Sequence, residues 1–148
     1  MARVRSYSAR DFRKAALQRF EDAEILLERD RLTGAFYLAG YGAECILKAL
    51  ILSTIDDRKL GTEVERSFKG PAGHNIEELR SYYKKKCKRT IPALVSDQLT
   101  RILTWRTDLR YESSVKSRKE AEAFLDAVRD VIRWADGCIS HVTHKKKS

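Results

Sequence analysis

The 148-residue sequence contains few of the residues that indicate a cross-linked or metal-bound protein. Its three cysteines are an odd number without CxxC spacing, so they indicate neither a disulfide framework nor a thiolate metal site. Two prolines and seven glycines exclude collagen-like and low-complexity chains. We therefore expect no metal, no cofactor and a reducing compartment. Because the first residues show no secretory signal, the expected compartment is the cytoplasm.

The sequence also lacks the motifs of several enzyme classes. No GxGxxG, GxxxxGK[ST], HExxH or GxSxG occurs, so signatures for dinucleotide, P-loop, zinc-protease and serine-hydrolase chemistry are missing. One apolar run, residues 34–52, is long enough to raise the question of a membrane span, but Glu44 and Lys48 interrupt it. We expect a buried core helix there and no membrane partner.

Positive charge is what the sequence has in excess. There are 30 Lys and Arg against 21 Asp and Glu, a formal net charge of +9. Much of the excess lies in the terminal lysines 145–147 and in one run that follows two tyrosines: Lys84, Lys85, Lys86, Lys88 and Arg89. A charge run is usually a solvated face, whereas basic residues beside aromatics are also typical of single-strand nucleic-acid contact. Both interpretations stay open.

Apolar spacing predicts five helices and no strand. They cover about 8–30, 34–53, 75–89, 93–106 and 117–139, capped at two starts by Asn75 and Ser117. Residues 54–73 lack a clear period and are expected to form a long connection, and the basic tail 142–148 is expected to be disordered. The fourth helix should turn four residues inward: Leu94, Leu99, Ile102 and Leu103. The predicted fold class is all-α, a single up-and-down helical bundle over 1–148.

Several polar residues on these helices could carry function. Glu44 and Lys48 lie four apart on the most apolar helix, as a structural ion pair or as the lining of a ligand or subunit groove. Tyr37 and Tyr41 share one side of that helix, where they could stack on bases or fill core, and we expect them to fill core. His74 stands just before a helix start, a position more typical of a hydrogen-bonded residue than of a base.

The densest polar cluster lies at the end of the fourth predicted helix. It consists of Trp105, Arg106, Asp108, Arg110, Tyr111 and Glu112. Two guanidiniums beside aromatic rings could hold a phosphate bidentately. They could equally form salt bridges with the neighbouring carboxylates and fix the following loop.

The run GAFYLAGYGAECILKALIL at 34–52 resembles the second helix of HEPN domains, a family of nucleotide-binding helical bundles that usually dimerise. Other segments are similar in the same order. GHNIEEL at 73–79 resembles the entry to the family's third helix, LRYES at 109–113 resembles the segment before its last helix, and EAEAFLDAVRDVIRWA at 120–135 resembles that last helix. The resemblance covers nearly the whole chain.

The resemblance implies one of two branches. Many HEPN domains are metal-independent RNases with an Arg followed four to six residues later by His. No Arg precedes a His at that spacing here, since Arg133 and His141, like Arg66 and His74, have seven residues between them. HEPN proteins without the motif resemble the substrate-binding domain of nucleotidyltransferases, or stand beside a separate nucleotidyltransferase, often in toxin-antitoxin or defence systems.

We therefore expect a homodimeric, non-catalytic HEPN domain that binds a nucleotide, RNA or a nucleotidyltransferase partner. Under this interpretation seven residues shape the nucleotide or partner groove: Glu44, Lys48, His74, Arg106, Asp108, Arg110 and Tyr111. The alternative is a metal-independent endoribonuclease in which Arg133 and His141 build a composite site across the dimer.

Overall fold

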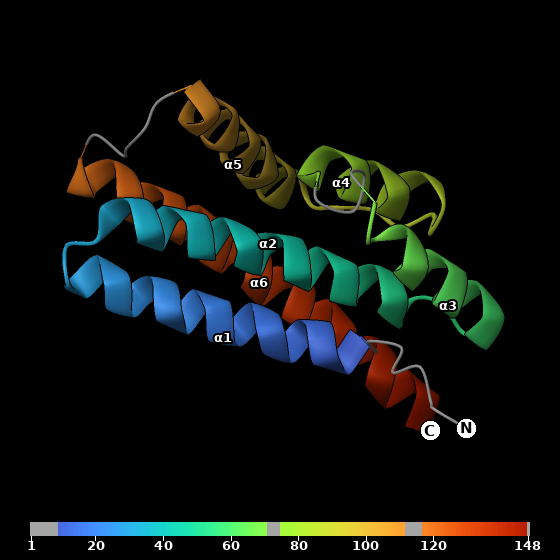
Figure 1. Ribbon diagram of the computed structural model, residues 1–148. Coiled ribbons are helices and arrows are strands. Elements are labelled where there is room, and N and C mark those ends of the chain that lie inside the picture. The colour runs from blue at the N-terminus through green and yellow to red at the C-terminus, as the bar shows by residue number, and fades with distance from the viewer. Residues whose placement is uncertain (1–8, 71–74, 112–116, 148) are drawn as a thin grey trace.

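A computed structural model describes residues 9–70, 75–111 and 117–147, of which 107–111 and 141–147 are described by their backbone alone. Within these ranges the chain forms six α-helices and no strand. They are α1 (Ala9–Glu28), α2 (Leu32–Ser53), α3 (Arg58–Ser67), α4 (Ile76–Lys85), α5 (Ala93–Tyr111) and α6 (Arg118–Lys147), shown in Figure 1. The predicted all-α fold class is confirmed, with six helices where about five were predicted.

The centre of the bundle is α2, which packs against α1, α3, α4 and α6. Figure 1 shows α1, α2 and α6 as three long helices side by side, with α1 antiparallel to α2. The backbones of α1 and α2 approach closely at Gly42, because a Cβ there would lie 3.3 Å from the carbonyl oxygen of Ala16. A helix that is apolar nearly all round needs neighbours on several sides, and α2 has them.

Among the described residues, α2 is the one helix long and apolar enough to cross a membrane. Within the bundle, 78% of its apolar window is buried. Its apolar surface is therefore taken up by contacts within the protein, as in a core helix. This agrees with the expected core helix at 34–52 and is consistent with a soluble protein.

Stacked aromatic rings join three helices in the core. Phe36 of α2 lies parallel to Phe124 of α6, with 3.7 Å between ring centroids. Trp105 of α5 meets Phe124 edge-on at 5.6 Å. Such ring pairs contribute about 1 kcal/mol each beyond the area they bury, so α5 is anchored to the central pair of helices at this point.

The expected long connection at 54–73 is wrong for half of its length, because it contains α3. Asp57 caps this helix, its side chain accepting from the backbone amides of Lys59 at 2.9 Å and Leu60 at 3.1 Å. Val64 and Phe68 are buried against the bundle. Only Leu60 and Val64 among the ten residues of α3 are large and apolar, too few to show a repeated apolar period in the sequence.

The fourth predicted helix is longer than expected, and one residue predicted to face inward is exposed. It corresponds to α5, which continues past residue 106 to Tyr111. Leu99 and Ile102 are buried as predicted, but Leu94 is 80% exposed, so its inward placement is wrong. Leu94 lies in the first turn of α5.

Two helix starts agree with the local signals in the sequence. Asn75 caps α4, accepting from the amides of Glu77 at 2.9 Å and Glu78 at 3.3 Å. Ser117 caps α6, accepting from the amide of Glu120 at 3.1 Å. The backbone of α6 then continues to Lys147, which covers all but the last residue of the 142–148 segment.

Candidate functional site

Glu44 on α2 is nearly inaccessible, with 2% of its surface exposed, and it forms an ion pair with Arg106 of α5 at 2.5 Å. Gly40 makes room for the arginine, since a Cβ at that position would lie 3.2 Å from the Arg106 Nε. Arg106 therefore lies over the helix from Gly40 to Glu44. The two groove residues predicted on different helices are brought together, and their contact ties α5 to α2.

Lys48 lies one turn further along α2 and is 5% exposed. Its ammonium is 5.7 Å from the ring centroid of Phe12 on α1 and 5.6 Å from that of Phe68 after α3. The two rings meet edge-on at 5.9 Å. A cation over two aromatic faces is stabilised by their negative electrostatic potential. Lys48 thus faces aromatic side chains of its own protein rather than an open groove.

Glu44 and Lys48 of α2, with the Arg106 of α5 that pairs with Glu44, are together called the buried charged face of α2. Next to it, Tyr37 and Tyr41 are 59% and 45% exposed, so the expectation that they fill core is wrong. They lie seven and three residues before Glu44, on the same side of α2. An exposed aromatic pair on the most buried helix is a surface that a partner could cover.

The remaining predicted groove residues cannot be placed by their side chains. Asp108, Arg110 and Tyr111 belong to the last turns of α5, where only the backbone is described. His74 lies outside the described residues. Of the seven predicted groove residues, Glu44 and Arg106 are in direct contact.

The predicted basic run forms the C-terminal end of α4 and the turn after it. All five residues are exposed, and they are called the basic rim: Lys84, Lys85, Lys86, Lys88 and Arg89. Lys88 has a left-handed backbone with φ of 53°. This conformation reverses the chain, and the Arg89 amide donates to the carbonyl of Tyr83 at 3.3 Å. Arg89 is thereby folded back against the helix.

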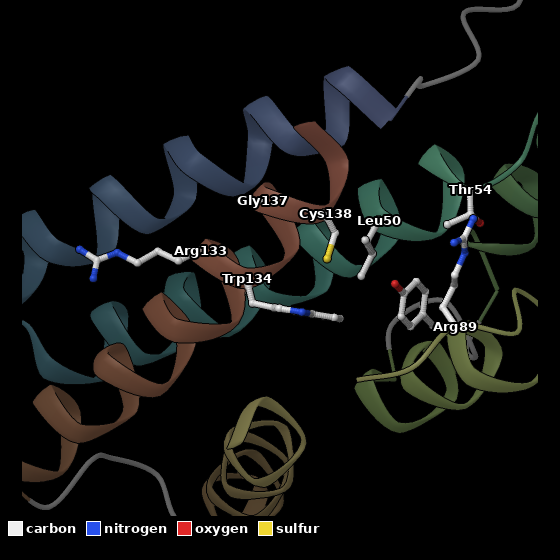
Figure 2. Close-up of a pocket in the computed structure, with 8 residues that line it drawn as sticks. Leu50, Thr54, Arg89, Arg133, Trp134, Gly137 and Cys138 are labelled. Carbon is white, nitrogen blue, oxygen red and sulfur yellow. The ribbon is translucent and has the colours of Figure 1, made fainter. Parts of the chain in front are cut away.

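A pocket of about 450 Å³ opens beside the basic rim, between α2, α4 and α6. Its lining consists of Leu50, Thr54, Tyr83, Arg89, Arg133, Trp134, Gly137 and Cys138. Figure 2 shows Trp134, Leu50 and Cys138 around a common space, with Arg89 beside Thr54 on one side of it. No carboxylate is found among the described residues that line it. The pocket therefore combines apolar walls with positive charge.

Burial keeps the hydroxyl of Tyr83 and the thiol of Cys138 protonated. Desolvation raises the pKa of Tyr83 to about 12, so its hydroxyl stays protonated at neutral pH. Burial also raises the pKa of the Cys138 thiol, against the opposing effect of the Arg89 guanidinium. The pKa of Cys87 is raised for the same reason. Both thiols are thus poor nucleophiles at neutral pH, and the pocket presents neutral donors beside one strong cation.

Arg133 and His141, the alternative catalytic pair, both belong to the continuous helix α6. Arg133 is exposed, and in Figure 2 its side chain points away from the other pocket residues. The side chain of His141 is outside the described part of the chain. Eight helical positions separate their Cα atoms by ~12 Å along the axis and turn them by ~80°, so they do not form a compact pair within one protomer.

The pocket was missed by the sequence analysis, although two patterns point to it. Trp134 and Cys138 lie four apart on α6, and Leu50 of α2 lies four residues before Thr54, the C-cap of that helix. Such spacing places each pair on one helix face. Nothing in the sequence indicates that these faces leave a space between them, because that depends on where α4 ends.

These features define an all-helical bundle with an ion pair on its central helix and a basic surface at one end. The model of the HEPN domain family matches residues 9–138, and the chain belongs to this family. Membership supports a nucleotide- or RNA-related role in general terms. Neither the comparison with curated proteins nor the comparison with solved structures gives a significant match.

Proposed function

We propose that this protein is a non-catalytic HEPN domain that binds RNA through the basic rim. One observation carries the proposal: the five cations of the rim are all exposed. Among the described residues, none of the five takes part in an ion pair. Cations that are not neutralised within the protein are available to phosphates, and phosphate contacts supply most of the affinity for nucleic acid.

The test is binding of a fluorescently labelled single-stranded RNA as a function of salt. Lys84, Lys85 and Lys86 would be replaced together by alanine and compared with a control that removes three exposed cations elsewhere, Lys14, Arg29 and Lys119. For single strands, log affinity falls with log salt with a slope of about −0.7 per phosphate contacted. We expect the rim variant to reduce that slope by about 2 and to weaken binding at least tenfold at low salt.

Two results would contradict the proposal. One is equal loss of binding in the rim variant and in the control, which would show that binding depends on net charge and not on the position of the cations. The other is absence of binding to RNA at 50 mM salt. An RNase function would appear as metal-independent cleavage of the same RNA that is lost in Arg133→Ala and His141→Ala. The ~12 Å axial separation of this pair within one protomer means that such cleavage would need a composite site across a dimer.

A second polypeptide is the other proposed ligand, at the exposed face that Tyr37 and Tyr41 form on α2. HEPN bundles usually dimerise, and we propose a homodimer through this face, in the cytoplasm. A nucleotidyltransferase of a toxin-antitoxin or defence system would be the heterologous partner. Light scattering should report a dimer at tens of micromolar, and Tyr37→Glu should give a folded monomer. A wild-type monomer would contradict this assignment.

A further inference from the structure

We propose that the pocket between α2, α4 and α6 receives one unstacked base of a single-stranded nucleic acid whose phosphates lie on the basic rim. This inference rests on the proposed RNA binding and specifies its form. Arg89 belongs to both places, because it is the last residue of the rim and also lines the pocket. A strand that follows the rim therefore passes the mouth of the pocket.

The pocket walls have the chemistry that recognises a planar ring. Trp134 and Tyr83 meet edge-on with 5.9 Å between centroids, and Leu50 completes the apolar lining. The volume of about 450 Å³ lies within the range of small-ligand pockets, ~300 to 1,000 Å³. Stacking of a base on an aromatic side chain contributes about 1 to 3 kcal/mol and does not depend on sequence.

The polar groups of the pocket favour an anionic ligand over a purely apolar one. Figure 2 places Arg89 beside Thr54 at the edge of the pocket, where the phosphate next to an inserted base can lie, whereas Arg133 points away from it. Thr54 and the protonated hydroxyl of Tyr83 can hydrogen-bond to base edges. A hydrocarbon ligand would use none of these groups. An acidic protein segment would lack the planar ring that the walls accommodate.

A paired base is not available to the pocket. In double-stranded RNA the bases are stacked and their edges lie in the grooves, whereas in a single strand they can be turned outward. The pocket therefore predicts a preference for single strands over duplex RNA of the same length. A free nucleotide has the same base and phosphate but lacks the further phosphates that contact Lys84, Lys85 and Lys86, so it should bind more weakly.

Gly137 offers a way to close the pocket without touching the rim. A Cβ at this position would meet nothing within 4 Å, so a larger side chain fits without a clash. We expect Gly137→Leu to fold normally and to bind single-stranded RNA about tenfold more weakly, with an unchanged salt slope and unchanged duplex binding. The matched control, Ser140→Leu, adds the same side chain at an exposed position of α6 and should bind like the wild type.

Tryptophan fluorescence provides a readout that does not depend on affinity. An eight-nucleotide RNA should quench the emission of the wild-type protein, and Trp134→Phe should abolish this quenching while the labelled RNA still binds. Wild-type affinity in Gly137→Leu, or quenching that persists in Trp134→Phe, would overturn the pocket assignment. Saturable quenching by adenosine monophosphate without tighter binding of the oligonucleotide would overturn the assignment to a strand in favour of a free nucleotide. Absence of all RNA binding would instead overturn the proposed function itself.

Discussion

The buried charged face of α2 and the basic rim are two charged regions whose charges are satisfied in different ways. In the first, Glu44 is paired with Arg106, and Lys48 lies between the rings of Phe12 and Phe68. In the second, all five cations are exposed, and none is ion-paired among the described residues. Charges held inside the bundle position its helices, whereas charges left at the surface are free to bind an external anion. Changes in the first region should alter stability, and changes in the second should alter binding.

The largest effect is expected where α2 approaches α1, two residues before Glu44. Gly42→Val places a branched side chain against the Ala16 carbonyl oxygen, which as a backbone atom cannot move aside. Overpacking of this kind costs about 3 kcal/mol of unfolding free energy. Urea denaturation should detect that loss, while the RNA affinity of the folded fraction stays at the wild-type value.

Gly137→Ala is the matched control, because the space around that Cβ is open. It should raise the unfolding free energy by up to about 1 kcal/mol, since alanine has the higher helix propensity. Equal destabilisation by both glycine substitutions would contradict the close approach of α1 and α2 at Gly42.

Removing the charge of Glu44 is expected to have the next largest effect. Glu44→Gln leaves Arg106 without its carboxylate, and loss of a charged hydrogen-bonded contact from a buried site costs about 2 kcal/mol. Arg106 is 31% exposed and can turn to water, which keeps the cost below that of a fully buried pair. Denaturation should report this loss without any change in the salt slope of RNA binding. A changed salt slope at unchanged stability would show that Glu44 contributes to RNA binding and not to the stability of the fold.

The Glu122→Gln variant is the corresponding control. Glu122 pairs with Arg118 at 3.0 Å on the surface of α6, where both side chains are about half exposed. Exposed i,i+4 pairs contribute about 0.3 to 0.5 kcal/mol. A loss in this variant as large as that in Glu44→Gln would contradict the distinction between buried and exposed charges.

The central helix and the caps could be predicted because their causes are local. A continuous apolar run from 34 to 52 has to be buried, and a side-chain acceptor at Asn75 or Ser117 satisfies amides two or three residues away. The same holds for the exposure of the basic rim, since five cations in six residues cannot be buried unpaired.

The pairing of Glu44 with Arg106 and the pocket could not be predicted in the same way. Their partners come from different helices, and the spacing within one helix does not determine which neighbour covers it. Lys48 illustrates the point, because its position four residues after Glu44 indicates an ion pair, whereas its ammonium lies over rings from α1 and the end of α3. Helix α3 escaped prediction because only two of its ten residues, Leu60 and Val64, are large and apolar.

The next smaller effect is expected in the pH dependence of the unfolding free energy, through Tyr83 in the pocket wall. The pKa of Tyr83 is about 12 in the folded protein against about 10 in an unfolded chain. Above pH 10 the unfolded state therefore releases a proton that the folded state keeps, and stability falls as pH rises. Between pH 9 and 11 this amounts to about 1.3 kcal/mol. Denaturation curves of wild type and Tyr83→Phe should differ by that pH-dependent amount, and parallel pH profiles would show that Tyr83 is not buried in the way described.

The smallest expected effect has opposite signs in stability and binding. Lys88 has a left-handed backbone, which costs a non-glycine residue more than it costs glycine. Lys88→Gly should therefore raise the unfolding free energy by about 0.5 kcal/mol, while the salt slope of RNA binding decreases by about 0.7 because one phosphate contact is lost.

Asp30, with φ of 59°, is the other described non-glycine residue in this conformation, and it lies far from the rim in the sequence. Asp30→Gly should change stability in the same direction and leave the slope unaltered. If both variants changed the slope equally, the charge of Lys88 would not be part of the binding surface. If only Lys88→Gly does, a charged residue is kept in a conformation that favours glycine because that charge contacts the ligand.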